Sequence, residues 1–230
     1  MKTRRNLALI VAAGKGQLPD SELPVQYMDL AGKPILARTI DCFEKSREVD
    51  EIVLVVSEDY LAYASQAVVD KFGYKKIHKI VTGGQSRQES VMAGLVACPR
   101  TTDKIAIHDG VRPFVINTLI GDLYAAANDS AAAIPGVHPD GTIKLAKDQL
   151  LTGTLSREDV FIAQTPQVFL YSKILEFHER ALAAKIEVTD DAMLAERYGM
   201  AVKIIGGHVD NIKITSPLDL VLAREIIKQW

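Results

Sequence analysis

Three short stretches combine glycine with charged or hydroxyl side chains, the residue types that bind phosphate groups. They are residues 12–16 (AAGKG), 83–90 (GGQSRQES) and 108–113 (HDGVRP). In the first, Gly14 and Gly16 allow backbone N–H groups to approach phosphate oxygens without obstruction by a side chain. The stretch is not a GxxxxGK[ST] loop, and Pro19 stands where a dinucleotide-binding loop has its third glycine. Taken alone, it predicts either a phosphate-binding turn or an ordinary tight turn.

The second stretch joins a glycine pair to the start of a helix. Ser86 is followed three residues later by Glu89, the spacing of a capping box, so a helix is expected from there toward Cys98. The backbone N–H groups of a helix N-terminus attract anions, and the Arg87 guanidinium adds a positive charge. We predict a corner that binds phosphate or a base; an ordinary capped helix is the alternative.

The third stretch follows a predicted strand with a carboxylate, a glycine and an arginine. The Asp109 carboxylate is suited to a metal ion or to a ribose hydroxyl. Arg112 is suited to an anion or to a structural ion pair. His108 is interpreted as a buried core histidine with its hydrogen bonds satisfied.

Further candidates lie in the second half of the chain. Lys213, on a short β segment predicted at 212–214, precedes a helix and can contact phosphate or remain solvated. Thr154, Arg157 and Thr165 offer hydroxyls and a guanidinium that can clamp a phosphate. No HExxH or GxSxG motif and no paired cysteines are present, so neither zinc hydrolysis nor serine-esterase chemistry is supported.

The elements that must position these residues alternate between strand and helix. Residues 7–12, 52–56 and 104–108 are short apolar runs rich in Val and Ile, typical of strands buried on both faces of a parallel sheet. Helices are predicted at 34–44, with Pro34 at the first helical position, and at 57–72, ending before Gly73. The alternation predicts a doubly wound α/β fold whose ligands bind beyond the carboxyl ends of the strands.

The pattern of residue types along the chain changes between residues 131 and 169. Short β-prone segments separated by Gly, Pro and Asp predict a strand, a projecting hairpin-like arm at about 136–163, and a return strand that ends at 164–167. Further elements are expected in the order helix, helix, strand, short strand, helix, at 172–184, 190–198, 202–205, 212–214 and from Pro217 after a Ser216 cap. We expect residues 1–230 to form one domain.

Composition narrows the function classes. With 27 basic and 29 acidic residues the formal net charge is −2, which favours neither duplex nucleic acid nor a membrane surface as partner. Cys42 and Cys98 are far apart, so no zinc site or disulfide is predicted, and a cytoplasmic location is expected. Basic residues 1–5 and the apolar run 7–13 superficially resemble a signal peptide, but the run is short and is better interpreted as a strand entering the glycine-containing turn.

Seven motifs occur in a fixed order along the chain. They are AAGxG at 12–16, PxQY at 24–27, GGxxRxxSV at 83–91, HDxxRP at 108–113, QTPQ at 164–167, TDD at 189–191 and NIK at 211–213. In this order and spacing they resemble the 2-C-methyl-D-erythritol 4-phosphate cytidylyltransferase family, over essentially the whole chain. The resemblance implies a Rossmann-like nucleotidyltransferase fold and a homodimer with interlocking β-arms. It also implies a non-mevalonate isoprenoid reaction in which CTP and methylerythritol phosphate give a CDP-alcohol and pyrophosphate, with Mg²⁺ as cofactor.

The resemblance also implies roles for individual residues. In that reaction the phosphate of the substrate attacks the α-phosphorus of CTP, so catalysis needs positioning and cations rather than a protein nucleophile. The nucleotide would be held by Ala12, Ala13, Gly14, Gly16, Gly84, Arg87 and Ser90. The catalytic groups would be Lys213 on the α-phosphate, Lys15 and Asp109. The polyol phosphate would contact Asp109, Arg112, Thr142, Arg157 and Thr165, partly across the dimer interface.

Two positions depart from the family pattern. Leu18 stands where the family has an arginine and Val25 where it has a lysine, both of which face the triphosphate. Lys15 and Lys33 are the nearby cations that can substitute, and we expect Lys15 to swing over the β- and γ-phosphates. Three hypotheses remain: the family reaction, the same chemistry on a related polyol phosphate such as ribitol 5-phosphate, or a catalytically impaired nucleotide-binding relative.

Overall fold

The computed structural model of the chain describes residues 5–19 and 21–230; residues 1–4, which open the signal-like segment, lie outside this part. The strands are β1 (Arg5–Ala12), β2 (Glu51–Val56), β3 (Ile77–Thr82), β4 (Thr102–Asp109), β5 (Ala132–Val137), β6 (Lys144–Lys147), β7 (Leu150–Thr154), β8 (Ile162–Ala163), β9 (Gln167–Leu170) and β10 (Lys203–Gly206). The α-helices are α1 (Ile35–Glu44), α2 (Leu61–Tyr63), α3 (Arg87–Ala97), α4 (Asn117–Ser130), α5 (Tyr171–Ala183), α6 (Asp191–Arg197) and α7 (Pro217–Ile226). Single 3-10 turns occur at Val25–Tyr27, Glu58–Tyr60, Arg157–Asp159 and Ile227–Gln229, and a π-helical segment at Ala64–Asp70.

A mostly parallel sheet forms the centre of the molecule. Its strand order is β10-β5-β9-β4-β1-β2-β3, and β8 pairs with β5 beside this path. Of these, β9 runs antiparallel to its neighbours β4 and β5, whereas the pairs made by β1 with β2 and with β4 are parallel. The expected doubly wound α/β fold is confirmed.

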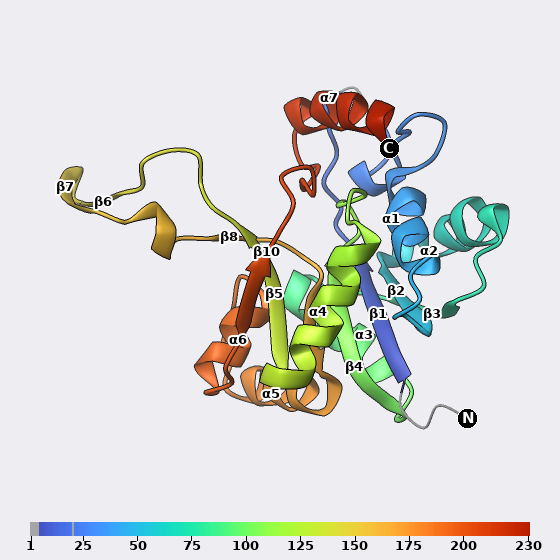
Figure 1. Cartoon of the computed structure of the whole chain (residues 1–230). Helices are drawn as coiled ribbons and strands as arrows, with labels where there is room; N and C mark the ends of the chain where they lie inside the picture. The colour runs from blue at the N-terminus through green and yellow to red at the C-terminus, as the bar shows by residue number, and fades with distance from the viewer. Residues whose placement is uncertain (1–4, 20) are drawn as a thin grey trace.

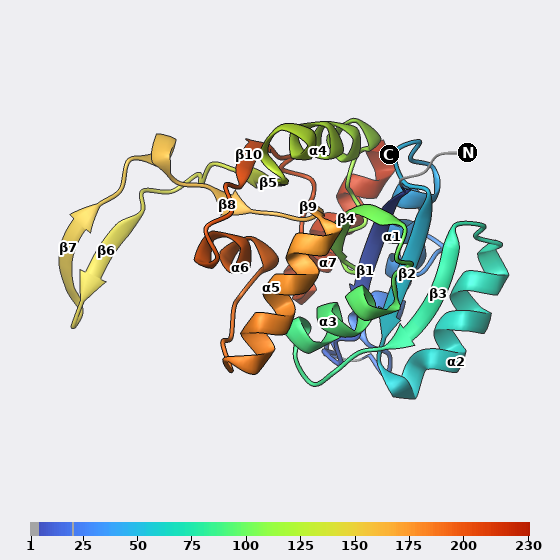
Figure 2. The same ribbon diagram turned by 90° about the horizontal axis from the view of Figure 1, so that it is seen from below.

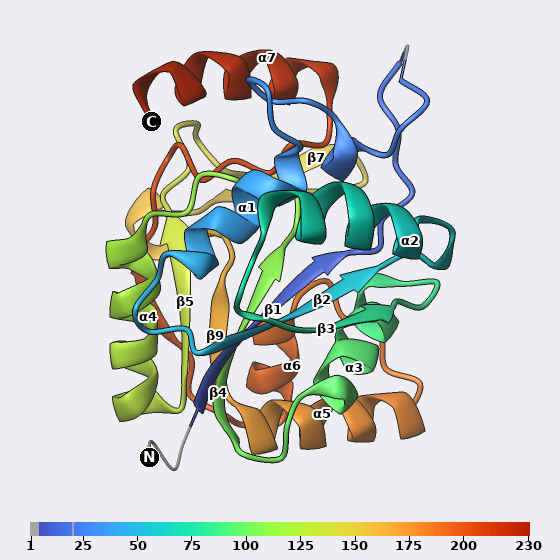
Figure 3. The same cartoon turned by 90° about the vertical axis from the view of Figure 1, so that its right-hand side faces the viewer.

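Alternation along the strands divides the core into two layers. In β1, Leu7 and Leu9 pack against α3 and α5, whereas Ala8 and Ile10 pack against α1 and α4. Figure 3 shows α1 and α4 in front of the sheet and α3, α5 and α6 behind it. Each fully buried Leu or Ile contributes about 1.5–3 kcal/mol to folding, so this double burial holds β1 at the centre. The apolar run 7–12 therefore lies in a central strand of the sheet, β1.

The carboxyl edge of the sheet carries the connections that matter for ligand binding. β1, β2 and β4 all end at this edge, and α7 lies across it near the loop that follows β1 (Figure 1). Ser216 caps α7 through a capping box, and Pro217 occupies the first helical turn, as predicted. Helix α7 thus covers part of this edge.

A two-stranded arm projects away from the sheet (Figure 2). Strands β6 and β7 pair only with each other in the described chain, through a turn at Asp148 and Gln149 with φ of 50° and 66°. Positive φ at both turn residues matches the right-handed twist of a hairpin. Leucines on the arm are exposed, with Leu150 and Leu151 at 72% and 70%.

Four local predictions need correction. Pro34 was expected at the first helical position, but it is the N-cap of α1, and the helix begins one residue later at Ile35. The helix predicted at 57–72 is divided into 3-10, α and π segments. Residues 212–214 form no strand: Ile214 donates one backbone hydrogen bond to Val111, and its side chain is buried under α7. The return strand of the arm stops at β8, and after Pro166 the chain enters the central sheet as β9, which the sequence did not predict as a separate element.

No helix within residues 5–19 and 21–230 is long and apolar enough to cross a membrane.

Candidate active site

A cleft of about 440 Å³ opens where β1, β2, β3 and β4 end. Its walls come from the loop after β1, the turn after β2, the corner before α3, the end of β4 and the loop before α7. The lining residues are Val11, Ala12, Ala13, Gly14, Lys15, Gln26, Ser57, Glu58, Asp59, Gly83, Gly84, Gln85, Ser86, Arg87, Ser90, Asp109, Val111 and Lys213. The cleft therefore lies where ligands of open α/β sheets bind.

The first wall is a backbone loop held in shape by Gln26. The buried Gln26 amide donates hydrogen bonds to the carbonyls of Ala12 and Gly14 at 2.9 and 2.7 Å. A Cβ on Gly14 would meet no protein atom within 4 Å, so the space above it is open to a ligand. Lys15 projects beside this opening and forms an exposed ion pair with Asp59 at 2.8 Å, which raises the pKa of the lysine.

The second wall is the glycine corner that begins α3. Ser86 and Glu89 form the predicted capping box, so the start of α3 is fixed. The Ser90 hydroxyl accepts a hydrogen bond from the Gly84 N–H and donates one to the Ser86 carbonyl. A Cβ on Gly83 would lie 2.6 Å from the side chains of Ala13 and Ser90, so only glycine lets this corner approach the first loop. The glycine corner and the first loop therefore lie side by side in the cleft.

Asp109 is the anionic centre of the cleft. Its Oδ1 lies 3.1 Å from Arg87 Nε, and its Oδ2 lies 3.4 Å from Arg112 Nε and 3.2 Å from Lys213 Nζ. Burial alone would raise the pKa of Asp109, but the charges of Arg87, Lys213 and Arg112 outweigh it and hold the pKa well below its ordinary value. Asp109 is therefore a carboxylate at neutral pH.

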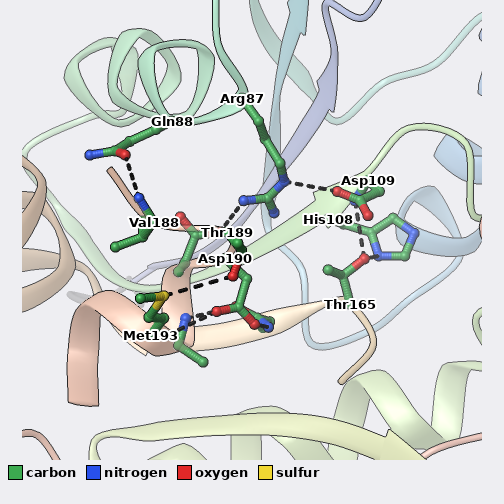
Figure 4. Close-up of polar contacts among 12 residues, drawn as sticks. Arg87, Gln88, His108, Asp109, Thr165, Val188, Thr189, Asp190 and Met193 are labelled. Atoms are coloured by element: carbon green, nitrogen blue, oxygen red, sulfur yellow. Dashed lines mark hydrogen bonds and ion pairs between the residues drawn. The ribbon is translucent and has the colours of Figure 1, made fainter. Parts of the chain in front are cut away.

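A chain of hydrogen bonds supports Asp109 from behind (Figure 4). The Asp109 N–H donates to Thr165 Oγ1 at 3.1 Å. His108 Nε2 lies 3.0 Å from the Arg112 carbonyl, which can only accept, so Nδ1 accepts from the Thr165 hydroxyl, also at 3.0 Å. Burial lowers the pKa of His108 to about 4, so the imidazole is neutral. His108 is a core histidine, as predicted.

Lys213 reaches the cleft from an anchored loop. Arg112 Nη1 donates to the Asn211 carbonyl at 2.8 Å, and the Asn211 amide donates to the Thr165 carbonyl at 2.8 Å. Ile214, on the other side of Lys213, is fully buried. These contacts fix the backbone, while the Lys213 side chain stays 41% exposed and its ammonium group lies beside Asp109.

The two positions that depart from the family pattern face away from the cleft. Leu18 and Val25 are only 7% and 6% exposed and belong to an apolar cluster with Phe114, Ile214 and α7. Lys33 does not replace them, because it forms an ion pair with Asp41 at 2.6 Å and lies over the Phe72 ring. Among the described residues that line the cleft, the cations are Lys15, Arg87 and Lys213.

Other predicted site residues lie outside the cleft of the same chain. Thr142 and Arg157 belong to the projecting arm region, where the Arg157 guanidinium donates to the Asp140 carbonyl at 2.9 Å. Thr165 is 5% exposed and supports Asp109 from behind. Arg112 touches Asp109 without lining the cleft, and Gly16 lies just beyond it.

Sequence reasoning gave no role to several residues that build the site. Gln26 stood in a quoted motif without an assigned function, yet it shapes the first loop. Glu58 and Asp59 follow a predicted buried strand, so the rule that sites lie at carboxyl ends of strands pointed to them. Asp191, in the TDD motif, is buried behind Arg87 and forms an ion pair with it at 2.8 Å.

The side chains present do not fit a metal site made by the protein alone. Mg²⁺ prefers carboxylate and phosphate oxygens, but both oxygens of Asp109 already face cations. Within the described chain no three His, Cys, Asp or Glu side chains are grouped as metal ligands. The prediction of Asp109 as a metal ligand is not supported by its surroundings.

Known proteins of one kind resemble the chain over its whole length. A family model of 2-C-methyl-D-erythritol 4-phosphate cytidylyltransferase matches residues 7–229. The protein of that name from Geobacter metallireducens is 44% identical over 225 residues, covering 96% of this chain and 97% of that protein. One from Clostridium botulinum is 42% identical over 226 residues, covering 98% of each. The crystal structure of 4-diphosphocytidyl-2C-methyl-D-erythritol synthase from Anaerococcus prevotii matches with a TM-score of 0.88 at 30% identity, covering 99% of this chain and 100% of that one. The chain belongs to the 2-C-methyl-D-erythritol 4-phosphate cytidylyltransferase family.

Proposed function

We propose that this chain transfers the cytidylyl group of CTP to 2-C-methyl-D-erythritol 4-phosphate. The observation that carries the proposal is the cleft itself: two backbone loops for a nucleotide face Asp109, Arg87 and Lys213 in a member of this family. A phosphate oxygen of methylerythritol phosphate attacks the α-phosphorus of CTP. The bond from the α-phosphorus to the β-phosphate oxygen breaks, and pyrophosphate leaves with the electron pair.

No residue needs to remove a proton in this reaction. The attacking phosphate is a dianion near neutral pH, because its second pKa is about 6. Asp109, which stays ionised among three cations, is suited to accept hydrogen bonds from the polyol hydroxyls. Lys213 lies beside it at 3.2 Å and is suited to the charge that develops on the α-phosphate.

The nucleotide is assigned to the two backbone loops. Residues 12–16 are assigned to the phosphates through their backbone, and Gly84, whose N–H donates to Ser90, lines the second loop that Ser90 fixes. Lys15 can leave Asp59 for the β- and γ-phosphates, because its ion pair is exposed and solvent weakens such pairs. The family implies Mg²⁺, which would neutralise triphosphate charge when it is bound together with the nucleotide.

We also propose a homodimer in which the arm of one subunit completes the cleft of the other. Thr142 and Arg157 do not line the cleft of their own chain, and the leucines of the arm are exposed. A second copy would bury those leucines and bring Arg157 to the substrate phosphate.

Both cysteines are free thiols, which supports the expected cytoplasmic location.

The test compares two polyol phosphates. Product formation from CTP is followed by chromatography with either methylerythritol phosphate or ribitol 5-phosphate. The proposal predicts a CDP-alcohol with methylerythritol phosphate at a kcat/KM at least tenfold above that for ribitol 5-phosphate. A reversed preference would reassign the substrate, and no product from either would reject transferase activity.

A further inference from the structure

The guanidinium of Arg87 is held between two carboxylates. Its Nε donates to Asp109 Oδ1 at 3.1 Å, and its Nη1 donates to Asp191 Oδ2 at 2.8 Å. Asp191 is the first residue of α6 and is only 1% exposed, so it does not contact a ligand in the cleft. Among the described residues that line the cleft, Arg87 is the side chain that Asp191 bonds.

Asp191 is itself held by a buried histidine. His178, on α5, lies with Nε2 at 2.9 Å from Asp191 Oδ1, and both side chains are 1% exposed. A carboxylate only accepts, so Nε2 carries the proton. His178 Nδ1 has no hydrogen-bond partner among the described residues, so Asp191 is the group that this ring orients. Burial alone would raise the pKa of Asp191, but Arg87 and His178 outweigh it and keep the pKa below its ordinary value.

This arrangement limits what Arg87 can do to Asp109. A free arginine grips a carboxylate with two parallel hydrogen bonds and covers both oxygens. Here Arg87 gives Asp109 one hydrogen bond, from Nε, and its Nη1 donates to Asp191, which fixes the direction in which the guanidinium faces. Arg112 is restrained in the same way, with Nε toward Asp109 and Nη1 on the Asn211 carbonyl. Asp109 thereby keeps lone pairs for a ligand.

We propose that Asp191, oriented by His178, is a positioning residue that turns Arg87 edge-on to Asp109 and keeps that carboxylate open to the polyol substrate. The inference rests on the proposed contact between Asp109 and the polyol. Loss of Asp191 frees Arg87 to close over Asp109, which weakens binding of the polyol phosphate more than binding of CTP.

The kinetic test uses Asp191→Asn, with Asp190→Asn as the matched control. Asp190 caps α6 and accepts a hydrogen bond from Gln167, but it does not touch Arg87. We expect Asp191→Asn to raise KM for methylerythritol phosphate about tenfold with KM for CTP changed less than twofold, since misplacement by 1 Å costs up to about 100-fold. Asp190→Asn should lower Tm and leave both KM values unchanged. Equal changes in the two KM values, or none, in Asp191→Asn would overturn the proposal.

Histidine variants keep the proposal testable if Asp191→Asn does not fold. His178→Leu removes the donor to Asp191, whereas the amide of His178→Gln can replace it. We expect KM for methylerythritol phosphate to rise about threefold in His178→Leu and to return to the parent value in His178→Gln. The same KM in both variants would overturn the proposal.

A crystal structure of His178→Leu separates this inference from the proposed function, because it needs no turnover. The inference predicts that Arg87 turns toward Asp109 and makes two hydrogen bonds to it, and an unchanged Arg87 would contradict it. Failure of the parent enzyme to form product would instead reject the proposed function.

Discussion

Lys15 is the cleft cation that must change partner when a triphosphate binds. It pairs with Asp59, beside Glu58, so carboxylates of the cleft wall compensate its charge. Leu18 and Val25 are buried in an apolar cluster and carry no charge. Lys15 is therefore the side chain best placed to replace the arginine and lysine that the resemblance implies at those two positions. We expect Lys15→Ala to lower kcat/KM for CTP on the order of 100-fold, as loss of one transition-state donor does. Steady-state kinetics checks this.

Two variants control the Lys15 experiment. Lys228→Ala removes a similarly exposed ion pair, between Lys228 and Glu225 at 2.7 Å, and neither of these residues lines the cleft. This variant should leave kcat/KM unchanged. Asp59→Asn releases Lys15 and should lower KM for CTP by about threefold, within the range of exposed ion pairs. That gain should vanish in the double variant with Lys15→Ala. Parent-like kinetics in Lys15→Ala would eliminate Lys15 as the replacement cation.

His108 makes stability depend on pH in a defined window. Burial lowers its pKa to about 4 from 6.5, so between these values the unfolded chain binds a proton that the folded chain does not. The free energy of unfolding should therefore rise with pH across this window, and the contribution, roughly 3 kcal/mol at most, should be lost as pH falls toward 4. The pKa of Asp109 is also lowered, but its contribution is lost only below its ordinary value of 3.8.

Urea unfolding between pH 4 and 7 tests the His108 contribution. His108→Gln keeps a donor for the Arg112 carbonyl and removes the titration. We predict a shallower rise of unfolding free energy with pH in the variant than in the parent. Parallel curves would mean that His108 does not set this dependence.

At the scale of elements, the loop after β1 is fastened to α7. Leu18 and Val25 pack with Leu30, Ile35 and residues of α7, so helix and loop share one apolar cluster. Leu18→Ala should lower the free energy of unfolding by about 2–3 kcal/mol, because it leaves a cavity in this cluster. Leu218→Ala, on the same helix but 75% exposed, should change it by less than about 0.5 kcal/mol. Equal effects in urea titrations would show that the loop is not packed as described.

Elements with strong local signals were predictable from the sequence. The apolar runs of β1, β2 and β4 and the capped starts of α3 and α7 carry enough local information to place them. β9 was not predictable as a separate strand, because its four residues follow Pro166 and depend on pairing with β4 and β5. Pairing partners distant in sequence leave no periodic pattern.

The site also has parts with local sequence signals and parts that depend on contacts between distant residues. Glycine turns and the Asp109 stretch show their chemistry in residue types, so it could be predicted that the two loops and Asp109 meet in one cleft. The pairs Lys15 with Asp59 and Arg87 with Asp191 join residues 44 and 104 positions apart, and only the fold reveals them. The burial of Leu18 likewise depends on α7, at the other end of the chain.

At the scale of the whole molecule, we propose one nucleotidyltransferase domain whose arm, about 136–163, joins two copies. The arm exposes Leu145, Leu150, Leu151 and Leu155, and burying such side chains contributes about 1.5–3 kcal/mol each. Leu150→Glu with Leu151→Glu should convert a dimer into a monomer without lowering Tm, because among the described residues β6 and β7 pair only with each other and not with the central sheet. Light scattering after size exclusion measures the mass.

The control for the arm is a change on another exposed surface. Leu218→Glu should leave the dimer intact. If the variant with both Leu150→Glu and Leu151→Glu keeps twice the mass of one chain, the arm is not the interface. A monomeric variant with parent-like kinetics would show that Thr142 and Arg157 are not supplied across it.

The most direct test of the account is pyrophosphate release from CTP and Mg²⁺ by the unmodified chain, with and without methylerythritol phosphate. We predict release that depends on methylerythritol phosphate, although Leu18 and Val25 offer no charge to the triphosphate. Tight binding of CTP with no release in either case would contradict it, because the cleft would then bind the nucleotide without stabilising its transfer.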